Sequence, residues 1–237
     1  MRSAGVAGGT DVNGESIART EALLGRPAMV SLASKRVAVV GVGGVGGWCA
    51  EALVRSGIAQ LTLVDDDVVA PSNLNRQCCA TAATLGMPKV EAMRARLLSV
   101  DPDAEVVARQ ERFVRYEGFG RFDAIVDCID SVDCKAELLL GATADGTPVF
   151  SSLGAAKRTD PTKVEVKRFS KVEGDGLARA LRQRFRRLGR FPAVDFPCAV
   201  SREAPAAIET LGSMMPVTAA FGMALAARVI AELSQPI

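Results

Sequence analysis

Three glycines in the segment RVAVVGVGGVGG, Gly41, Gly43 and Gly46, have the spacing G-x-G-x-x-G. An apolar run precedes them and a helical pattern follows, and such a turn brings backbone N–H groups and a helix N-terminus to a phosphate. Asp65 ends the next apolar run, nineteen residues after Gly46, where a carboxylate can accept hydrogen bonds from ribose hydroxyls. Taken alone, this pattern favours NAD, and it leaves open a turn that only packs a helix on a strand.

A set of polar residues beyond this acidic strand end changes the interpretation. DDDVVAPSNLNRQ contains Asn73, Asn75, Arg76 and Gln77, Lys89 follows at a helix start, and Asp130 is expected to end a later strand. All of them fall at carboxyl ends of predicted parallel strands, where such sheets bind ligands. Arg76 can bind phosphate oxygens through two hydrogen bonds, Lys89 supplies a point charge, and Asp130 can hold Mg²⁺. A redox dinucleotide requires none of these groups, so the set favours the phosphates of ATP.

Composition narrows the chemistry further. The 237 residues include six cysteines without a CxxC pair and no histidine, which disfavours a structural zinc site and removes histidine as an acid or base. The net charge is only +2, but the segment from Lys157 to Arg190 contains twelve basic and four acidic residues. This asymmetry indicates either a polyanionic partner or a solvated arginine-rich helix.

The elements that must position these residues alternate between strand and helix patterns. Strands are expected in RVAVVG, AQLTLVD, AEVVARQ, FDAIVDCID, TPVFSSLG and, at a sheet edge, TKVEVKRF. Helices are expected over 17–32, 48–56, 88–100 and 214–233, and where Leu177, Leu181, Phe185 and Leu188 form an apolar stripe. The alternation predicts an α/β fold, namely a Rossmann-like doubly wound, mainly parallel sheet with helices on both faces, plus a basic helix and a C-terminal apolar helix.

The motifs resemble the adenylating domain of the ubiquitin-activating-enzyme-like superfamily, the ThiF/MoeB/HesA group. The resemblance rests on RVAVVGVGGVGGWCAEALVRSGI, LTLVDDDVVAPSNLNRQ, MPKVEA and FDAIVDCIDS, most of residues 35–135. It implies a domain that binds ATP and Mg²⁺ and adenylates a carboxylate. It assigns ribose binding to Asp65, phosphate contacts to Asn73, Arg76 and Lys89, and the metal to Asp130, with Asp67 and Gln77 expected beside the same nucleotide.

The resemblance also implies a homodimer. The family passes an N-terminal arginine across the dimer interface to the partner's ATP, and SIARTE places Arg19 in that role. Ser16 stands where the motif usually has another arginine, a departure that concerns the packing of this arm. Arg19, Arg76, Lys89 and the metal would neutralise the charge that develops during adenylation, so the reaction requires no enzyme base.

Later motifs resemble one branch of the superfamily, the tRNA threonylcarbamoyladenosine dehydratase group. They are RTEALLG, GAAKRTDPTKVEV, GDGLARALRQRFRR, CAVSREAP and GSMMPVTAAFG, with Gly176 where a proline is common. Membership implies ATP-dependent adenylation of the threonyl carboxylate of a modified adenosine next to the tRNA anticodon, followed by ring closure with net loss of water. The alternatives are a sulfur-carrier adenylyltransferase, whose usual CxxC…CxxC zinc site this chain lacks, an NAD-dependent oxidoreductase and a non-catalytic nucleotide-binding scaffold.

Partners follow from the same resemblance. Arginines of the basic segment could contact phosphates of a tRNA anticodon stem-loop, and they are Arg179, Arg182, Arg186, Arg187 and Arg190. With one tyrosine and one tryptophan in the chain, recognition by shape and charge is expected rather than readout of many bases. Cys198, in DFPCAVSRE, is expected in an exposed loop; an incidental thiol is favoured over a functional one that would serve a sulfur-transfer or carrier protein.

The chain is expected to form one adenylating domain. Residues 1–15 are expected to be disordered, and 16–237 to divide into an ATP-binding core (35–156), a basic tRNA-facing segment (157–200) and a C-terminal helical part (201–237). No apolar run reaches the roughly 18–20 residues of a membrane span, and the N-terminus lacks a signal peptide's apolar core. The expectation is a cytoplasmic protein without a membrane partner.

Overall fold

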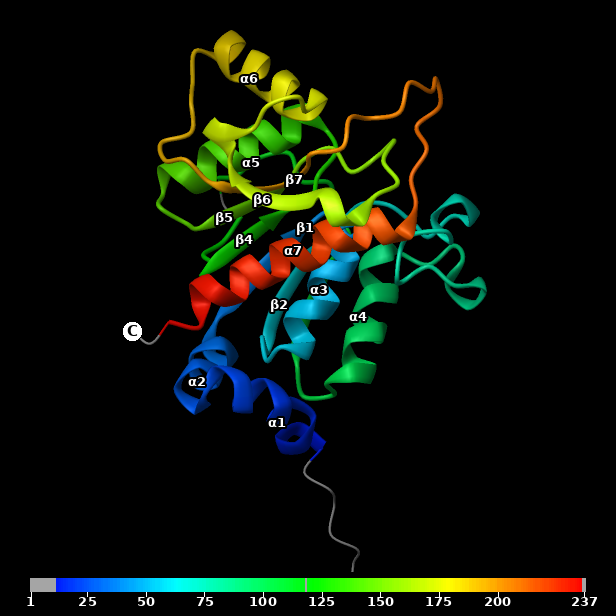
Figure 1. Cartoon of the computed structure of the whole chain (residues 1–237). Helices are drawn as coiled ribbons and strands as arrows, with labels where there is room; N and C mark the ends of the chain where they lie inside the picture. Colours follow the sequence, from blue (N-terminus) through cyan, green and yellow to red (C-terminus); the bar gives the residue numbers. More distant parts are fainter. Residues whose placement is uncertain (1–11, 118, 236–237) are drawn as a thin grey trace, which may run out of the picture.

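The computed structural model describes residues 12–117 and 119–235, and its centre is a seven-stranded sheet (Figure 1). The strands are β1 (Arg36–Val40), β2 (Gln60–Val64), β3 (Glu105–Arg109), β4 (Ala124–Asp127), β5 (Val149–Ser152), β6 (Val164–Arg168) and β7 (Pro197–Ser201). Their order is β3-β2-β1-β4-β5-β7-β6, and among the strands of the described residues only β6 runs antiparallel to its neighbour. The predicted Rossmann-like sheet is confirmed, with β6 at its edge.

Helices cover both faces of this sheet. On one face lie α3 (Gly46–Arg55), α4 (Lys89–Val100) and α7 (Met215–Leu233), and on the other lie α5 (Val132–Ala144) and α6 (Gly176–Leu188). The remaining helices are α1 (Val12–Leu24), α2 (Arg26–Ser34) and the short η1 (Pro71–Asn73), η2 (Ala82–Thr84), η3 (Pro161–Lys163) and η4 (Phe169–Lys171). In Figure 1, α1 and α2 lie beyond the C-terminal end of α3.

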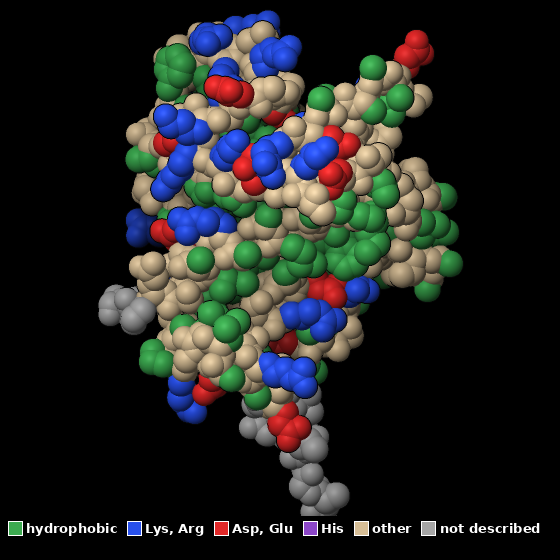
Figure 2. Space-filling view, in the orientation of Figure 1, with side chains coloured by type: hydrophobic (Ala, Val, Ile, Leu, Met, Phe, Trp, Pro, Cys, Tyr) green, Lys and Arg blue, Asp and Glu red, His purple; other side chains and the backbone are tan. Residues whose placement is uncertain are grey.

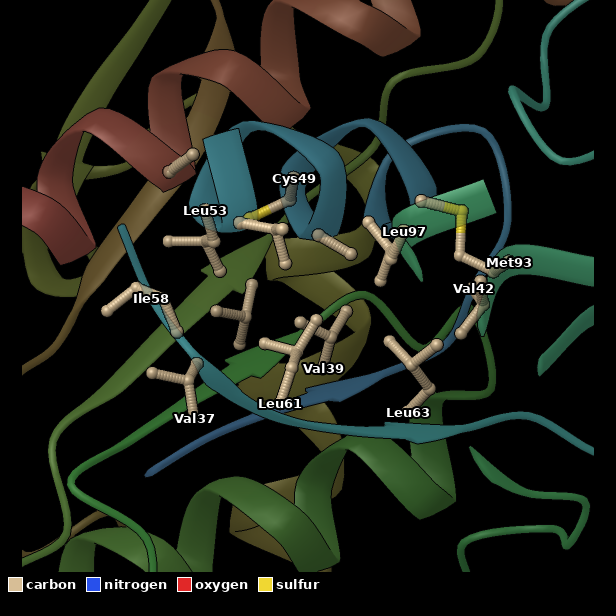
Figure 3. Close-up of a cluster of buried hydrophobic side chains, with 14 of the residues drawn as sticks. Val37, Val39, Val42, Cys49, Leu53, Ile58, Leu61, Leu63, Met93 and Leu97 are labelled. Atoms are coloured by element: carbon tan, nitrogen blue, oxygen red, sulfur yellow. The ribbon is translucent and has the colours of Figure 1, made fainter. Parts of the chain in front are cut away.

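Side-chain alternation along the strands divides the core into two layers. Val37 and Val39 of β1 belong to the cluster that packs under α3, α4 and α7, part of which Figure 3 shows. Ala38 and Val40 of the same strand belong to the cluster under α5 and α6. Both faces of β1 are therefore apolar, which explains why its sequence reads as a continuous hydrophobic run.

The C-terminal helix α7 is a core element. It has 19 residues and a mean hydropathy of 1.4, so by length and composition it could span a membrane, contrary to the expectation that no apolar run reaches that length. Val217, Phe221, Leu225 and Val229 are nevertheless fully buried against the rest of the fold. At Gly222 it crosses α3 so closely that a Cβ would lie 2.6 Å from the carbonyl oxygen of Val45.

The N-terminal helical segment differs from the prediction in two ways. The expected helix over 17–32 is two helices, because Gly25 between them has a φ of 83°, a conformation that L side chains rarely adopt. Helix α1 begins at Val12, so residues 12–15 are helical rather than disordered. The rest of the segment predicted to be disordered, residues 1–11, lies outside the described residues.

Strand β7 corrects the predicted division of the C-terminal third. It is parallel to β5 and antiparallel to β6, and it lies between them inside the sheet. The basic segment 157–200 is therefore not one outward-facing unit, because its β7 residues are buried. The part 201–237 is helical only from Met215, and residues 202–214 form a loop that continues from β7.

Candidate functional site

The glycine turn joins β1 to α3 at the carboxyl edge of the sheet. Gly41 has a φ of 91°, and a Cβ on it would lie 2.6 Å from the carbonyl oxygen of Cys128. A Cβ on Gly46 would lie only 1.8 Å from the carbonyl oxygen of Gly41. Larger residues cannot occupy either position, and the tight turn places the N-terminus of α3 at this edge with its free N–H groups.

Asp65 is fixed against this turn. Its carboxylate accepts a hydrogen bond from the backbone N–H of Val42 at 2.6 Å and another from that of Asp67 at 3.0 Å. Burial raises the pKa of the Asp65 carboxyl, although these two donors and the charge of Lys89 oppose the effect. The structure thus brings the residue assigned to the ribose to the glycine turn.

Arg76 lies over the same turn. A Cβ built on Gly44 would lie 3.1 Å from Cγ of Arg76, so the arginine stem rests on the glycine backbone. Nη1 of its guanidinium donates to the carbonyl of Ser72 at 2.8 Å and to Oδ1 of Asn75 at 2.9 Å. The indole N–H of Trp48, in α3, donates to the backbone carbonyl of Arg76 at 3.0 Å. The arginine is therefore anchored to the helix whose N-terminus faces the site.

Two amides complete this wall of the site. Asn73 is buried and caps its own turn, because its Oδ1 accepts from the N–H of Ala70 at 2.9 Å. The Gln77 side chain is also buried, and its Nε2 lies 3.9 Å from a Cβ built on Gly43. Oε1 of Gln77 has no hydrogen-bond partner among the described residues, and buried polar atoms without a partner are rare. An amide with spare bonding capacity beside a glycine turn fits a ligand-binding role.

Asn75, which the sequence placed in this polar set without an individual role, connects Arg76 to the loop before α7. Its Oδ1 accepts from Arg76, and its Nδ2 donates to the carbonyl of Ser213 at 2.9 Å. The neighbouring Gly212 carbonyl accepts from the N–H of Lys157 at 2.8 Å. Loops after β2, β5 and β7 are thus tied together, a long-range link that no local sequence signal announces.

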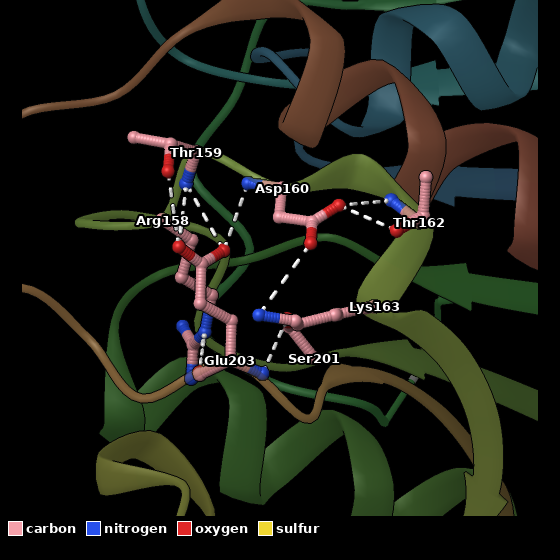
Figure 4. A network of polar contacts seen from close by, with 7 residues as sticks. All are labelled: Arg158, Thr159, Asp160, Thr162, Lys163, Ser201 and Glu203. Atoms are coloured by element: carbon pink, nitrogen blue, oxygen red, sulfur yellow. Dashed lines mark hydrogen bonds and ion pairs between the residues drawn. The ribbon is translucent and has the colours of Figure 1, made fainter.

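The loops that follow β5 and β7 contain a polar network around Glu203 (Figure 4). The Glu203 carboxylate accepts from the backbone N–H groups of Thr159 and Asp160 at 2.9 to 3.1 Å, and the donation from Asp160 is the foremost cause that lowers its pKa. Beneath it, the buried guanidinium of Arg158 donates to the Glu203 carbonyl at 3.0 Å and pairs with Asp175 at 3.2 Å. Asp175 in turn caps α6 by accepting from the N–H of Ala178 at 2.9 Å. The basic helix is therefore anchored to the edge that carries the nucleotide site.

Lys89 is the first residue of α4 and already has a partner. Its Nζ lies 2.6 Å from Oδ2 of Asp67, and the lysine side chain is 7% exposed while that of Asp67 is 66% exposed. The sequence predicted both residues beside the nucleotide but not their ion pair. Because Asp67 faces water, it can be released into solvent when another anion takes its place at the buried ammonium group of Lys89.

The predicted metal residue, Asp130, does not end a strand. Strand β4 ends at Asp127, and Asp130 is exposed in the loop before α5, at the same sheet edge. The side chains of Asp65, Asp66 and Asp67 also come within 4.8 Å of one another. Carboxylate oxygens suit Mg²⁺, so Asp130 and this acidic run fit the ion chemically, although Asp65 and Asp67 already engage other groups.

Arg19 is not brought to this site within one chain. It lies exposed on α1, which Figure 1 shows at the opposite end of α3 from the glycine turn. Contact between α2 and Gly57, just past the C-terminus of α3, agrees with this placement, since a Cβ on Gly57 would lie 2.6 Å from Cε of Met29.

The arginines of the basic segment have two different environments. Arg179, Arg186, Arg187 and Arg190 are exposed, and Figure 2 shows Lys and Arg side chains gathered over α6 at the top of the view. Arg182 instead donates to the carbonyls of Phe169 and Val172 at 2.8 and 2.7 Å, and lies over the Phe169 ring. Four of the five predicted arginines are therefore available to a polyanion, whereas Arg182 has a structural role.

The prediction of an exposed Cys198 is wrong. The residue is in β7 and is fully buried, and burial raises the pKa of its thiol well above the usual value. A thiol that is neutral and inaccessible cannot accept an acyl group or carry a persulfide without unfolding of the strand. Cys78, Cys79 and Cys134 are likewise buried, as expected for structural cysteines, and all six cysteines are free thiols.

Comparison with known proteins gives consistent matches. The model of the ThiF family matches residues 17–236. A tRNA threonylcarbamoyladenosine dehydratase from Bacillus subtilis is 38% identical over 176 residues, which are 72% of this chain and 69% of the relative. A yeast protein from Saccharomyces cerevisiae, tRNA threonylcarbamoyladenosine dehydratase 2, is 37% identical over 81% of this chain, and this chain spans only 44% of its length.

A solved structure agrees with these relatives. The crystal structure of an E. coli tRNA N6-threonylcarbamoyladenosine dehydratase in complex with ATP aligns with a TM-score of 0.86 and 32% identity. The alignment covers 94% of this chain and 96% of that one. Fold, motif order and family model therefore agree, and the chain belongs to the ThiF family.

Proposed function

We propose that this protein is an ATP-dependent tRNA threonylcarbamoyladenosine dehydratase. The observation that carries the proposal is the convergence of Arg76, Gln77 and Asp65 on one glycine turn, in a chain that resembles dehydratases over most of its length. In this reaction the threonyl carboxylate attacks the α-phosphate of ATP, and pyrophosphate leaves. The neighbouring carbamoyl group then attacks the acyl carbon, and AMP departs with one carboxylate oxygen, so the nucleoside loses one water in total.

The residues at the turn supply charge and position for this chemistry. Asp65 holds the ribose, while the N–H groups at the start of α3 together with Asn73 and Gln77 contact the phosphates. Arg76 binds the phosphate oxygens on which negative charge builds up as pyrophosphate leaves. Ring closure joins two groups of one substrate, so orientation replaces a catalytic base, which fits a chain without histidine.

Lys89 joins the site by exchanging its partner. Its ion pair with Asp67 is open to solvent on the aspartate side, so an incoming phosphate can compete for the ammonium group. Asp130 would hold Mg²⁺, with the acidic run after β2 as a further source of carboxylate ligands, and the ion would offset the negative charge of the phosphates.

The proposal includes a homodimer in which Arg19 reaches the ATP bound by the partner subunit. An unpartnered apolar surface supports this arrangement, and it includes Leu74, Leu85, Leu211, Met215 and Met223, each between 42% and 81% exposed. Figure 2 shows a band of hydrophobic side chains over α7 and the loops between β2 and α4. A contiguous apolar band of this kind is typical of a protein interface.

Mixing two inactive variants tests the dimer and Arg19 together. Arg19→Ala and Arg76→Ala should each be inactive, but mixed dimers contain one intact site built from Arg76 of one subunit and Arg19 of the other. Random subunit exchange should restore about a quarter of wild-type activity, since half of the dimers are mixed and each has one working site. A mixture that stays inactive, with mixed dimers verified by differently tagged subunits, contradicts the role of Arg19.

Mass analysis of nucleosides tests the reaction itself. The protein is incubated with ATP, Mg²⁺ and tRNA that carries threonylcarbamoyladenosine, and the tRNA is then digested. We expect an ATP-dependent loss of one water from that nucleoside, which Arg76→Ala abolishes while remaining folded. No mass change, combined with pyrophosphate exchange that depends on an added sulfur-carrier protein, would replace this proposal by the adenylyltransferase alternative.

A further inference from the structure

A pocket lies at the end of the sheet opposite to the glycine turn, where strand β7 begins. It has a volume of about 340 Å³, and it lies between the C-terminal half of α6, the end of β6 and the loop that leads into β7. The rings of Phe169, Phe185 and Phe196 form its apolar base, and Phe191 and Val194 line its mouth. None of these residues belongs to the nucleotide site.

The base of this pocket is rigid. The rings of Phe169 and Phe196 stack with centroids 5.0 Å apart and planes 15° from parallel, and Phe185 meets Phe169 edge-on at 6.1 Å. The Arg182 guanidinium lies over the Phe169 ring, 4.9 Å from its centroid, and donates hydrogen bonds to two backbone carbonyls. Phe169, Phe185 and Phe196 are 8% exposed or less, so they form a rigid floor and are not themselves a stacking surface.

The mouth of the pocket is apolar and exposed. Phe191 is 64% exposed and Val194 is 57% exposed, so two large apolar side chains stand in water on one loop. Such an exposed patch beside a cavity is typical of a binding surface.

The rim of the pocket is basic. Arg186 lines it directly, and the exposed Arg187 and Arg190 follow at the end of α6. The one carboxylate in the lining, Asp195, already accepts from the N–H and hydroxyl of Ser170 at 3.1 and 2.6 Å. The pocket therefore combines one exposed aromatic ring, Phe191, with a positive rim, which complements a nucleobase attached to a phosphate backbone.

We propose that this pocket receives an unpaired nucleobase of the tRNA substrate, stacked on Phe191, while Arg186, Arg187 and Arg190 contact the flanking phosphates. The proposal rests on the proposed function and adds a base-binding site to it. It also revises the expectation of recognition by charge and shape alone, because the exposed ring of Phe191 supplies a stacking surface that tyrosine and tryptophan do not. Since the pocket lies far from the reacting atoms, it should affect tRNA binding and not the chemical step.

Steady-state kinetics with Phe191→Ala provide the first test. The variant should raise KM for tRNA by about 5- to 100-fold, with kcat unchanged, because stacking of one base contributes about that factor. Phe191→Trp should restore the wild-type KM. Val114→Ala removes a valine that is 65% exposed elsewhere on the surface and should change nothing. A KM and a tRNA Kd within about twofold of wild type for Phe191→Ala would overturn the proposal.

An abasic scan identifies the base. Anticodon stem-loops that carry the modified adenosine are prepared with one other loop base removed at a time, and their Kd values are measured. At one position the abasic RNA should bind the wild type as weakly as the intact RNA binds Phe191→Ala, and combining both changes should cause no further loss. Losses that multiply at every position would contradict the proposal.

The two proposals can fail separately. If the wild type dehydrates the nucleoside but Phe191→Ala binds tRNA normally, the pocket proposal fails and the proposed function stands, and a selective loss of carrier-protein binding would then identify a protein-docking surface. If Phe191 governs tRNA binding but no water is lost, the proposed function fails and the pocket stands. Arg186→Ala should also lower the salt dependence of tRNA binding by about one unit of slope, whereas Arg115→Ala, 74% exposed on another loop, should not.

Discussion

Charged side chains at the carboxyl edge of the sheet fall into two groups that differ in how they are paired. Around the glycine turn, Arg76 is half-buried and Lys89 holds an aspartate that faces water. At the end of β4, the strand beside β1, Asp127 forms an ion pair with Lys135 at 2.7 Å in which both side chains are fully buried. A ligand can replace the partners of the first group, whereas nothing can reach the second. Pairing and access, not charge alone, distinguish the proposed site from its scaffold.

Breaking the buried pair should have the largest effect. Lys135→Met leaves Asp127 without its counter-ion, and we expect a loss of about 3–5 kcal/mol in the free energy of unfolding at neutral pH. Urea denaturation measures this loss. The double variant Asp127→Asn with Lys135→Met should recover part of it, because the amide carries no charge and can still accept from the Ser151 hydroxyl. A single variant as stable as the wild type would show that the pair is not part of the scaffold.

The stability of the Lys135→Met variant should also depend on pH. Burial raises the pKa of Asp127 even beside Lys135, and without the lysine the folded-state pKa must rise further. Below the unfolded-state pKa the carboxyl is protonated in both states and carries no penalty; above the folded-state pKa the penalty is complete. The deficit of Lys135→Met should therefore shrink as pH falls from 7 toward 4. A deficit independent of pH would contradict this account.

Removing Arg76 should affect activity and not stability. Its guanidinium partners are the Ser72 carbonyl and Asn75, both exposed to water, so Arg76→Ala leaves no buried group unpaired. We expect a loss of about 10²- to 10³-fold in kcat for dehydration, the range seen when one transition-state donor is removed. Thermal melting should match the wild type. An Arg76→Ala protein that is active but unstable would show that Arg76 stabilises the fold and does not act in the reaction.

Lys89 should show a smaller effect of the same kind. Lys89→Met keeps the apolar stem and removes the charge, and the released Asp67 is solvated. We expect KM for ATP to rise by about tenfold or more, as for loss of a hydrogen bond to a charged group, with little change in stability. Arg228→Met, on an exposed helical face where the arginine pairs with Glu232, is the matched control. An unchanged KM would indicate that the lysine never leaves Asp67.

The smallest effect is expected in the polar network around Glu203. Glu203→Gln weakens the acceptor that holds the N–H groups of Thr159 and Asp160, both at the surface. Global stability should stay near the wild type, but trypsin should cleave faster after Lys157 and Lys163, because local opening of this loop becomes easier. Cleavage rates measured under native conditions decide the question. Equal rates would mean that the loop is held by Arg158 and the Gly212 carbonyl alone.

Local patterns predicted the parallel core well and the C-terminal third less well. Strands buried on both faces give long apolar runs, so β1, β2, β4 and β5 were evident, but the run FDAIVDCID continues past the end of β4 because Ile129 also packs into the core. Strand β7 was missed because PCAVS is short and begins with a proline five residues after Pro192, and its partners lie far away in the sequence. This omission produced the wrong environment for Cys198.

The site shows the same division between local and long-range information. The glycine turn, Asp65 and Arg76 were predictable because each depends on residue type at a fixed spacing next to a strand end. The pairing of Lys89 with Asp67, the bridge through Asn75 and the carbonyl contacts of Arg182 depend on how distant segments meet. No periodicity or spacing encodes those contacts.

The close crossing at Gly222 has a consequence for synthesis of the protein. Helix α7 rests directly on Val45 of the glycine turn and on Trp48 and Cys49 just after it, yet the ribosome makes α7 long after them. Until α7 has emerged, the apolar face of α3 is open to solvent and the turn lacks its outer support. A nascent chain that already contains the whole nucleotide-binding motif should therefore bind ATP poorly, and the exposed face is where chaperones would be expected to engage it during translation.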